Sequence, residues 1–356
     1  MPSAQKTKRR LAIWLLPAFS VVLFFGATEG IIRALGLARA LDADFRFFVQ
    51  RVDNDVEERF NQADAALMWR PRPGYQDARI TISSQGFRDR EYAATKPEGT
   101  RRILALGDSS TFGHDVALED TWHAILEKRL ERRLQRRPGD RWEVINAGVT
   151  GYTSSLALRM YREHGRSLDP DIVVLYIGLN DVIAKYHLSD DAILARSGPD
   201  LARRLQNSVL LHLHTWLLIK RGVNAISSWV EGDAARAPVA RVSEEQYLQN
   251  LRALARETTT DGARLVLISS PVCKEWTAGL HDAEGVYRRR ALLHEEAARL
   301  DVPLLYVRRL TEAAETFNAA LFLDSVHPNP RGHGLLAERL HELLESENLL
   351  SSEPAP

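Results

Sequence analysis

The chain has 356 residues, of which 45% are hydrophobic and 26% are charged, which is typical of a folded globular protein. Lysine and arginine together number 47, as do aspartate and glutamate, so no net positive charge attracts nucleic acid. The single cysteine, Cys273, excludes an intramolecular disulfide and a cysteine-rich metal site. We therefore expect a folded protein that has no nucleic-acid partner.

An uncharged segment near the N-terminus predicts a membrane anchor. Residues 11–28 carry no charged side chain, and about 18 helical residues span about 27 Å, close to the roughly 30 Å hydrocarbon core of a bilayer. The preceding residues 1–10 are rich in lysine and arginine, which favours a cytoplasmic N-terminus. The pattern predicts a single-pass membrane protein whose remaining chain is extracytoplasmic, or periplasmic in a cell with two membranes.

Two other interpretations of this segment stay open. Ala38, Arg39 and Ala40 form a small-x-small sequence like that of a cleaved signal peptide, but they lie well beyond the apolar run. A buried core helix is the second alternative. An uncleaved anchor is the preferred interpretation, because no soluble fold needs such a run directly after a basic tail.

The region between the anchor and residue 100 changes in character along its length. Residues 31–60 mix apolar and charged side chains, as expected for a juxtamembrane helix and linker. Residues 66–92 contain prolines, glycines and a short alternation of apolar and polar side chains. We expect short extended segments here that pack on the main domain.

From residue 101 the pattern alternates between strands and helices. Short apolar runs predict five strands, at residues 103–106, 142–145, 172–177, 265–268 and 302–307. Apolar residues at helical spacing predict helices at residues 118–134, 155–166, 244–257, 287–300 and 334–344. This alternation implies a parallel sheet covered on both faces, with functional residues at the carboxyl ends of its strands.

A long insertion interrupts the alternation at about residues 183–243. Its centre, residues 205–219, is strongly apolar and has basic residues at both ends. A helical cap over the carboxyl edge of the sheet is the preferred interpretation, and a membrane-surface contact is the alternative. His212 and His214 lie in this region, but alternate residues of a helix point to different faces, so we expect no metal site.

Polar residues follow the predicted strands at four places. Ser109 stands at a turn from strand to helix, where backbone N–H groups stabilise a developing oxyanion. Gly151 and Asn180 follow the second and third strands. Asp324 lies three residues before His327, which suits a carboxylate that orients an imidazole. Turn or capping chemistry explains each place alone, but the four together in this order indicate a catalytic site.

The residues at these four places resemble the sequence blocks of the SGNH, or GDSL, hydrolase superfamily. The blocks are GDSS at 107–110, NAGVTGYTS at 146–154, GLND at 178–181 and DSVHPN at 324–329. The resemblance covers about residues 100–346. It implies an α/β fold, a flavodoxin-like three-layer α/β/α sandwich with a five-stranded parallel sheet, here preceded by the N-terminal transmembrane helix.

The resemblance also implies the roles of the site residues. Ser109 corresponds to the nucleophile, and Asp324 and His327 complete the triad. The oxyanion hole corresponds to the backbone N–H groups of Ser109 and Gly151 and the side-chain amide of Asn180. Gly148, in the same block, is the alternative to Gly151.

The expected domain organisation follows from these assignments. It comprises a basic tail (1–10), an anchor (11–28), a linker with extended segments (29–100), a hydrolase domain (101–346, with the insertion at about 183–243) and a C-terminal tail (347–356).

The expected function is hydrolysis of carboxylic esters of a glycan, a lipid or a small molecule through an acyl-enzyme, with no metal and no cofactor. One alternative is a membrane-tethered O-acyltransferase that uses the same triad to modify an envelope polysaccharide. The other is a non-catalytic binding module, against which the intact blocks argue. The sequence does not indicate the substrate, the acyl chain length or the oligomeric state.

Overall fold

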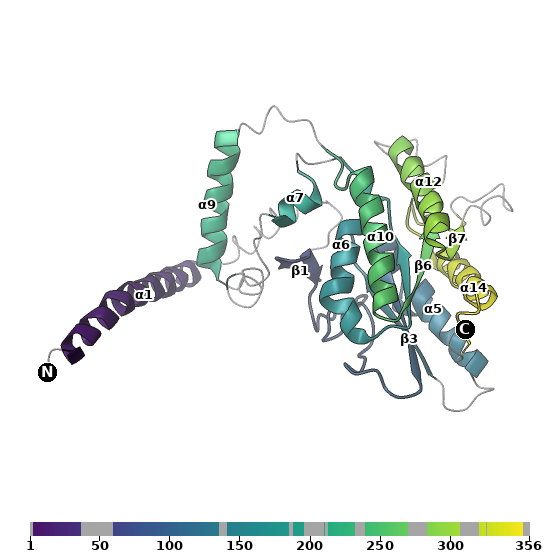
Figure 1. Cartoon of the computed structure of the whole chain (residues 1–356), viewed down its shortest axis with the longest axis horizontal. Helices are drawn as coiled ribbons and strands as arrows, with labels where there is room; N and C mark the ends of the chain where they lie inside the picture. The colour runs from purple at the N-terminus through teal and green to yellow at the C-terminus, as the bar shows by residue number, and fades with distance from the viewer. Residues whose placement is uncertain are drawn as a thin grey trace. The chain divides into compact units, whose positions relative to one another are not determined.

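The computed structural model describes residues 3–36, 60–134, 141–184, 188–195, 210, 213–231, 239–269, 283–306, 320–324 and 326–351. The chain divides into two compact units (Figure 1). One comprises Met1–Gln50 and Gly198–Arg236, and the other Arg51–Ser197 and Ala237–Pro356. Cys273 and His212 lie outside the described residues.

The second unit is built on a five-stranded parallel sheet. Its strands are β3 (Thr100–Gly107), β4 (Arg141–Gly148), β5 (Ile172–Tyr176), β6 (Arg264–Ser269) and β7 (Leu304–Tyr306). Their spatial order is β4-β3-β5-β6-β7, which is the flavodoxin-like order 2-1-3-4-5 when the strands are counted along the chain. The predicted fold class and five-stranded sheet are confirmed.

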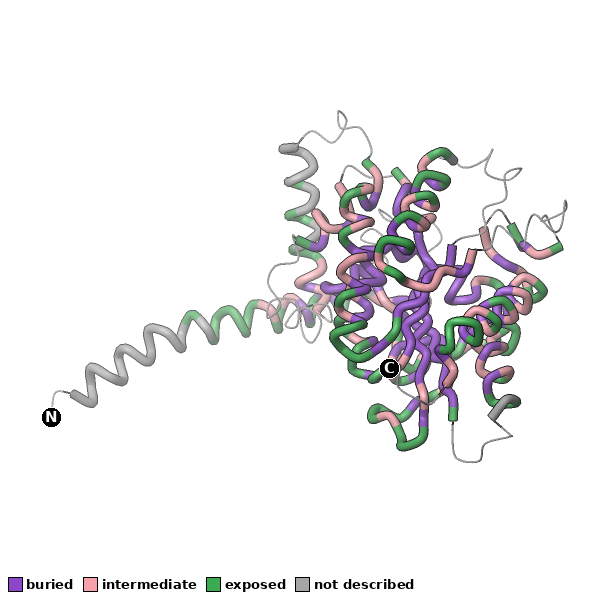
Figure 2. Tube along the Cα trace, turned by 45° about the vertical axis from the view of Figure 1, so that its right-hand side comes forward, coloured by how far each residue is buried: buried purple, intermediate pink, exposed green. Residues whose placement is uncertain are grey.

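Helices cover both faces of this sheet (Figure 1). On one face, α5 (Trp122–Leu134) packs against α14 (Pro330–Ser346). On the other lie α6 (Ser154–Met160), α10 (Glu244–Thr260) and α12 (Ala283–Leu300). Buried residues run along the strands between these layers (Figure 2). The continuous apolar runs of the strands thus lie where a sheet covered on both faces needs them.

The observed helices depart from the predicted ones mainly at their ends. A short 3₁₀ turn, η1 (Leu118–Asp120), precedes α5. Helix α6 passes into a π turn, η2 (Tyr161–Gly165), and a 3₁₀ turn, η3 (Arg166–Leu168). Asp169 then adopts a left-handed backbone with φ of 52°, which ends the helical path.

A β-hairpin precedes the sheet in sequence. Its strands are β1 (Asn61–Asp64) and β2 (Met68–Pro71), which pair antiparallel. The Asp64 carboxylate accepts the N–H groups of Ala66 and Leu67, at 2.8 and 3.0 Å, and so closes the turn between the strands. Trp69 in β2 is fully buried. Strand β2 lies within residues 66–92, for which the sequence predicts extended segments, whereas β1 precedes them.

The other unit contains the N-terminal helix α1 (Ser3–Ala34) and helix α9 (His214–Glu231). The buried Glu29 of α1 accepts the backbone N–H of Thr215 at 3.0 Å, in the first turn of α9. Its carboxylate also bonds with His214 Nδ1 at 2.7 Å and accepts Arg33 Nε at 2.9 Å. One carboxylate thus joins the two helices and satisfies a backbone donor at a helix start.

The predicted transmembrane anchor at residues 11–28 is not supported. These residues lie within α1, but the helix continues through the charged Glu29 and Arg33, which pair with each other. Within the described ranges, no helix combines the length and the apolar character that crossing a bilayer requires. The extracytoplasmic location depended on this anchor and stays a prediction, as does the cap role of the insertion.

Candidate active site

The candidate nucleophile lies at a tight turn between β3 and a single-turn helix. Helix α4 (Ser109–Phe112) starts directly after its N-cap Asp108, whose Oδ1 accepts the backbone N–H of Ser110 at 2.9 Å. A Cβ on Gly107 would lie 2.2 Å from Thr111 Oγ1 and 2.5 Å from the Tyr176 carbonyl oxygen. The turn therefore needs glycine at position 107, and Ser109 is presented at the carboxyl edge of the sheet.

Ser109, His327 and Asp324 form a hydrogen-bonded relay. Ser109 Oγ lies 2.7 Å from His327 Nε2, and His327 Nδ1 lies 2.6 Å from Asp324 Oδ2. Asp324 Oδ1 accepts the backbone N–H groups of Val326 and His327, each at 2.8 Å. The loop thus fixes the carboxylate, and the carboxylate fixes the imidazole ring against the serine.

Hydrogen bonds within the loop and to Ser110 hold the loop that carries Asp324 and His327. Phe322 and Pro328 form an isolated antiparallel bridge, and the Leu323 N–H donates to the His327 carbonyl oxygen at 2.8 Å. Ser110 Oγ donates to the Val326 carbonyl oxygen at 3.4 Å. The first two contacts close the loop on itself, and the bond from Ser110, across 216 residues of sequence, holds the loop beside the nucleophile.

Hydrogen bonds set the ionisation of Asp324. Partial burial acts to raise its pKa, but the hydrogen bond with His327 and the N–H groups of Val326 and His327 outweigh it and lower the pKa to about 2. The carboxylate is therefore ionised at neutral pH. An ionised carboxylate at Nδ1 stabilises the imidazolium that forms when His327 takes a proton.

The pKa of the N-cap Asp108 is shifted upwards, opposite to that of Asp324. Its full burial raises the pKa to about 6, although the Ser110 N–H and the nearby His327 act to lower it. Its Oδ1 accepts the Ser110 N–H, so the carboxylate is directed at the helix start. Asp108 therefore shapes the turn that presents Ser109.

The register of the sheet aligns the loops that carry the predicted oxyanion donors. Gly107 at the end of β3 lies opposite Gly148 of β4 and Tyr176 of β5. The loops that contain Ser109, Gly151 and Asn180 therefore begin side by side at one edge. This is the edge at which parallel α/β sheets bind their ligands.

Gly148 and Gly151 differ in their surroundings. The Gly148 N–H already donates to Asn146 Oδ1 at 3.0 Å, and a Cβ there would lie 2.4 Å from the Phe112 nitrogen. Gly148 thus allows α4 to pack closely on β4. Gly151 adopts a φ of +76°, which side chains disfavour, and belongs to the turn after the strand. Of the two glycines, Gly151 is the better donor candidate.

Asn180 lies in a 3₁₀ turn, η4 (Asn180–Val182), after β5. Its Nδ2 donates to the Tyr152 carbonyl oxygen at 2.9 Å, which uses one of the two amide hydrogens. The neighbouring Asp181 is buried and accepts the Ser154 N–H at 3.1 and 3.2 Å. The turn after β5 is therefore bonded to the turn after β4.

Two residues near the relay lie outside the predicted triad and oxyanion hole. The His114 ring centroid lies 4.6 Å from that of His327, so His114 lines the site. Arg88 is buried and donates to the carbonyl oxygens of Phe112, Gly113 and Val116. Its guanidinium holds the end of α4, and only the folded chain reveals this because Arg88 lies far from α4 in sequence.

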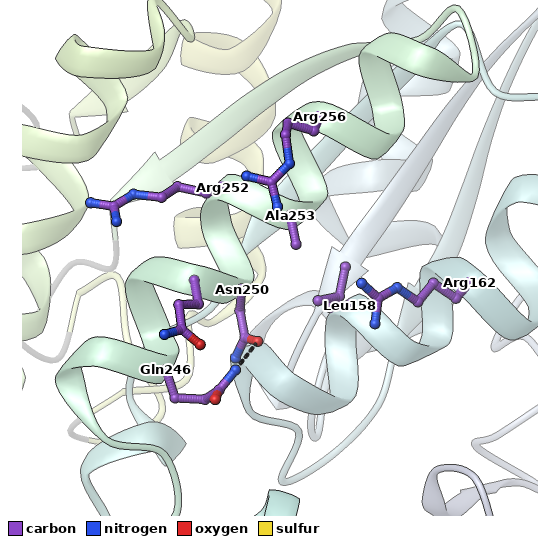
Figure 3. A pocket seen from close by; sticks show the side chains of 8 residues that line it. Leu158, Arg162, Gln246, Asn250, Arg252, Ala253 and Arg256 are labelled. Atoms are coloured by element: carbon purple, nitrogen blue, oxygen red, sulfur yellow. Dashed lines mark hydrogen bonds between the residues drawn. The ribbon is translucent and has the colours of Figure 1, made fainter. Parts of the chain in front are cut away.

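A surface groove of about 370 Å³ lies between α6 and α10 and contains none of the predicted site residues (Figure 3). Arg162 and Arg252 line it, but each is paired with a carboxylate. Arg162 donates to Glu257 and Arg252 donates to Glu296. The groove is therefore distinct from the relay of Ser109.

The comparisons with known proteins match the sequence of the chain to one family. Residues 105–335 match the model of the GDSL-like lipase/acylhydrolase family. No curated protein matches the chain in sequence.

Several solved structures are similar to the chain. The lipase/acylhydrolase from Enterococcus faecalis shares 17% identity at a TM-score of 0.47, covering 72% of this chain and 100% of that chain. An acetyl xylan esterase, AlAXEase, shares 15% at a TM-score of 0.45, covering 68% and 98%. The acetylxylan esterase Axe2 from Geobacillus stearothermophilus shares 19% at 0.45, covering 68% and 94%. Because these identities and TM-scores are low, the assignment rests on the sequence match.

Proposed function

The chain belongs to the GDSL-like lipase/acylhydrolase family, and we propose that it cleaves carboxylic esters with Ser109 as the nucleophile, His327 as the general base and Asp324 as the residue that orients His327. The observation that carries this proposal is the continuous relay from Ser109 Oγ through His327 to Asp324, with distances of 2.7 and 2.6 Å. This is the arrangement that activates a serine hydroxyl for acyl transfer.

The acylation step uses both nitrogens of His327. Ser109 Oγ attacks the ester carbonyl carbon while its proton passes to His327 Nε2, and the carbonyl π electrons move to the oxygen. The resulting imidazolium is stabilised by Asp324, whose pKa of about 2 keeps it ionised. When the tetrahedral intermediate collapses, the bond to the leaving oxygen breaks and His327 returns the proton to the departing alcohol.

The deacylation step repeats this chemistry with water. His327 takes a proton from a water molecule, whose oxygen attacks the acyl carbon. The bond to Ser109 Oγ then breaks, the proton returns to Ser109, and a carboxylic acid leaves.

The oxyanion of both steps needs hydrogen-bond donors. We assign the backbone N–H groups of Ser109 and Gly151 and the second amide hydrogen of Asn180 to this role. Helix α4 begins at Ser109, and the first N–H groups of a helix lack partners within the helix. Gly148 is left out because its N–H is bonded to Asn146.

The direct test is hydrolysis of p-nitrophenyl acetate by the full chain. We expect Ser109→Ala and His327→Ala each to lower kcat by about 10³-fold or more, because the two residues act as one unit. Ser167→Ala is the matched control, since the Ser167 hydroxyl is exposed and donates only to the local His164 carbonyl oxygen. Equal activity of all three variants and the wild type would refute the assignment.

Product analysis would identify the acyl acceptor. We propose water as the acceptor and an ester of a glycan, a lipid or a small molecule as the donor. An acetylated glycan is incubated with the enzyme in the presence and absence of an unacetylated oligosaccharide. Free acetate as the product in both cases supports hydrolysis, whereas acetyl transfer to the oligosaccharide would make the enzyme an O-acyltransferase.

A further inference from the structure

Three successive carbonyl oxygens of the turn after β4 are each bound by a side chain from elsewhere in the chain. The carbonyl oxygens of residues 150–152 accept, in order, from Trp69 Nε1 at 3.0 Å, Arg241 Nη1 at 2.7 Å and Asn180 Nδ2 at 2.9 Å. Only Asn180 belongs to the sequence blocks of the family resemblance. The other two donors make the turn a preformed element.

The bond from Trp69 acts on the peptide unit that supplies a proposed oxyanion donor. The Thr150 carbonyl and the Gly151 N–H belong to one planar peptide, and this peptide is trans. In a trans peptide the C=O and N–H point in opposite directions. A donor fixed on the Thr150 oxygen therefore fixes the direction of the Gly151 N–H, and it also polarises the amide so that its N–H donates more strongly.

Trp69 is itself held in place. Its side chain is fully buried in β2, and its carbonyl oxygen accepts the Tyr152 hydroxyl at 2.7 Å. The rings of Trp69 and Tyr152 meet edge to face with centroids 5.7 Å apart. Two hydrogen bonds of opposite direction thus join the hairpin to the turn, which restricts both to one arrangement.

Arg241 completes this support. It is fully buried and pairs with the buried Asp190 through two hydrogen bonds, Nε to Oδ1 at 3.0 Å and Nη2 to Oδ2 at 2.9 Å. Asp190 also accepts the hydroxyl of Thr153 at 2.7 Å. The Arg241 guanidinium lies 5.7 Å from the centroid of the Trp69 ring. The charge is neutralised inside the protein, and the cation contacts the indole that binds the turn.

We propose that Trp69 is a positioning residue of the oxyanion hole, whose indole N–H aims the Thr150–Gly151 peptide so that the Gly151 N–H meets the developing oxyanion. The proposal rests on the proposed esterase function. The two roles of Trp69 depend on different parts of its side chain. The ring provides the packing, and the N–H provides the positioning. The hairpin β1–β2 then becomes part of the catalytic apparatus.

The test replaces the N–H and keeps the ring. Benzothienylalanine at position 69 has sulfur in place of the indole N–H and nearly the same shape, and Trp69→Phe is the second variant. Full-chain enzymes are compared for kcat and KM on p-nitrophenyl acetate, for inhibition by a trifluoromethyl ketone that forms a tetrahedral adduct, and for their midpoints of unfolding in urea.

Removal of one oxyanion donor usually lowers kcat by about 10²–10³-fold. The Trp69 variants keep the Gly151 N–H but hold it less firmly, so we expect a smaller effect, a fall in kcat of about tenfold at unchanged KM. The affinity for the trifluoromethyl ketone should fall by the same factor, while the benzothienyl variant keeps the wild-type unfolding midpoint. Tyr92→Phe is the matched control, because Tyr92 is also buried and donates to a backbone carbonyl, that of Val144, at 3.3 Å. Its kcat should equal that of the wild type.

The outcomes separate this inference from the proposed function. If the wild type is active and loses activity with Ser109→Ala, but the benzothienyl variant keeps the wild-type kcat and inhibitor affinity, Trp69 has no positioning role. A rise in KM with unchanged kcat would overturn it as well. A wild type whose ester hydrolysis is insensitive to Ser109→Ala would instead refute the esterase proposal itself.

Discussion

The side-chain amide of Asn180 has two donor hydrogens, and the structure shows the partner of one of them. One hydrogen of its amide is bonded to the Tyr152 carbonyl oxygen, and the other is assigned to the oxyanion. Its side chain therefore anchors the turn after β4 and, in the proposed mechanism, also donates to the oxyanion. This double use explains why an amide, which carries two donors on one nitrogen, suits the position.

Replacing this amide gives the first prediction. Asn180→Ala should lower kcat/KM for p-nitrophenyl acetate by about 10²–10³-fold, the usual loss when one oxyanion donor is removed. The Ser109–His327 relay stays intact, so measurable activity should remain. Steady-state kinetics with the unfolding midpoint as the folding control check this, and unchanged turnover would remove Asn180 from the oxyanion hole.

The residues of the site were predictable to different extents. Ser109, Asp324 and His327 lie in short sequence blocks, and the structure brings their side chains together. Trp69 and Arg241 bind the same turn across 81 and 90 residues of sequence, respectively. No local pattern encodes such pairings, because they depend on how the hairpin and the segment before α10 pack on the sheet.

Apolar runs located all five strands of the sheet but not their ends, because β3, β4 and β6 are longer than predicted and β5 and β7 are shorter. Strand β3 extends beyond the predicted run through Arg102, which is charged and nevertheless buried beside the buried Glu143 of β4. Their side chains pair at 2.7 Å, and Arg102 also donates to the Leu168 carbonyl oxygen. A rule that ends a strand at a charge fails here because the two charges neutralise each other inside the protein.

The close packing of α4 on β4 gives the second prediction. Gly148→Ala should destabilise the protein by about 1–3 kcal/mol, because the added Cβ would lie 2.4 Å from the Phe112 nitrogen and the backbone would have to shift. Gly334→Ala in α14 is the control. Its Cβ would meet no atom within 4 Å, and alanine in a helix should add about 0.5–1 kcal/mol. Urea unfolding of both variants checks this, and a Gly148→Ala variant as stable as the wild type contradicts it.

A buried histidine should make the stability of the whole molecule depend on pH. His333 of α14 is 1% exposed, and its Nδ1 accepts the Trp122 N–H at 3.2 Å. Burial, together with the positive charges of Arg88 and His327, lowers the pKa of His333 to about 3. Above pH 6.5 the ring is neutral in both the folded and the unfolded state, and it contributes no pH dependence.

Below pH 6.5 the unfolded state takes up a proton that the folded state excludes, until the pH approaches 3. As the pH is lowered through this window, His333 should therefore reduce the free energy of unfolding by up to about 1.4 kcal/mol per pH unit. The third prediction is that His333→Asn removes this contribution, because the Asn oxygen still accepts a hydrogen bond but does not titrate. Urea unfolding at pH 7.5 and pH 5 checks this, and equal pH dependence in variant and wild type would contradict it.

Sequence and structure disagree most about the N-terminal region. Residues 11–28 are uncharged and suggested a membrane anchor, but the described helices include none suited to crossing a bilayer. A local hydropathy pattern does not register that Glu29, directly after the segment, is buried against the start of α9. The α/β unit, whose alternation of strands and helices is strong, was predictable as a whole.

The proposed mechanism requires that Ser109 becomes covalently acylated with the help of His327. The most direct measurement is intact-protein and peptide mass spectrometry of the full chain after reaction with a fluorophosphonate. We predict one adduct, located on Ser109, that is absent in Ser109→Ala and forms far more slowly in His327→Ala. An adduct on another residue, or no adduct on the folded wild type, would contradict the catalytic role of Ser109.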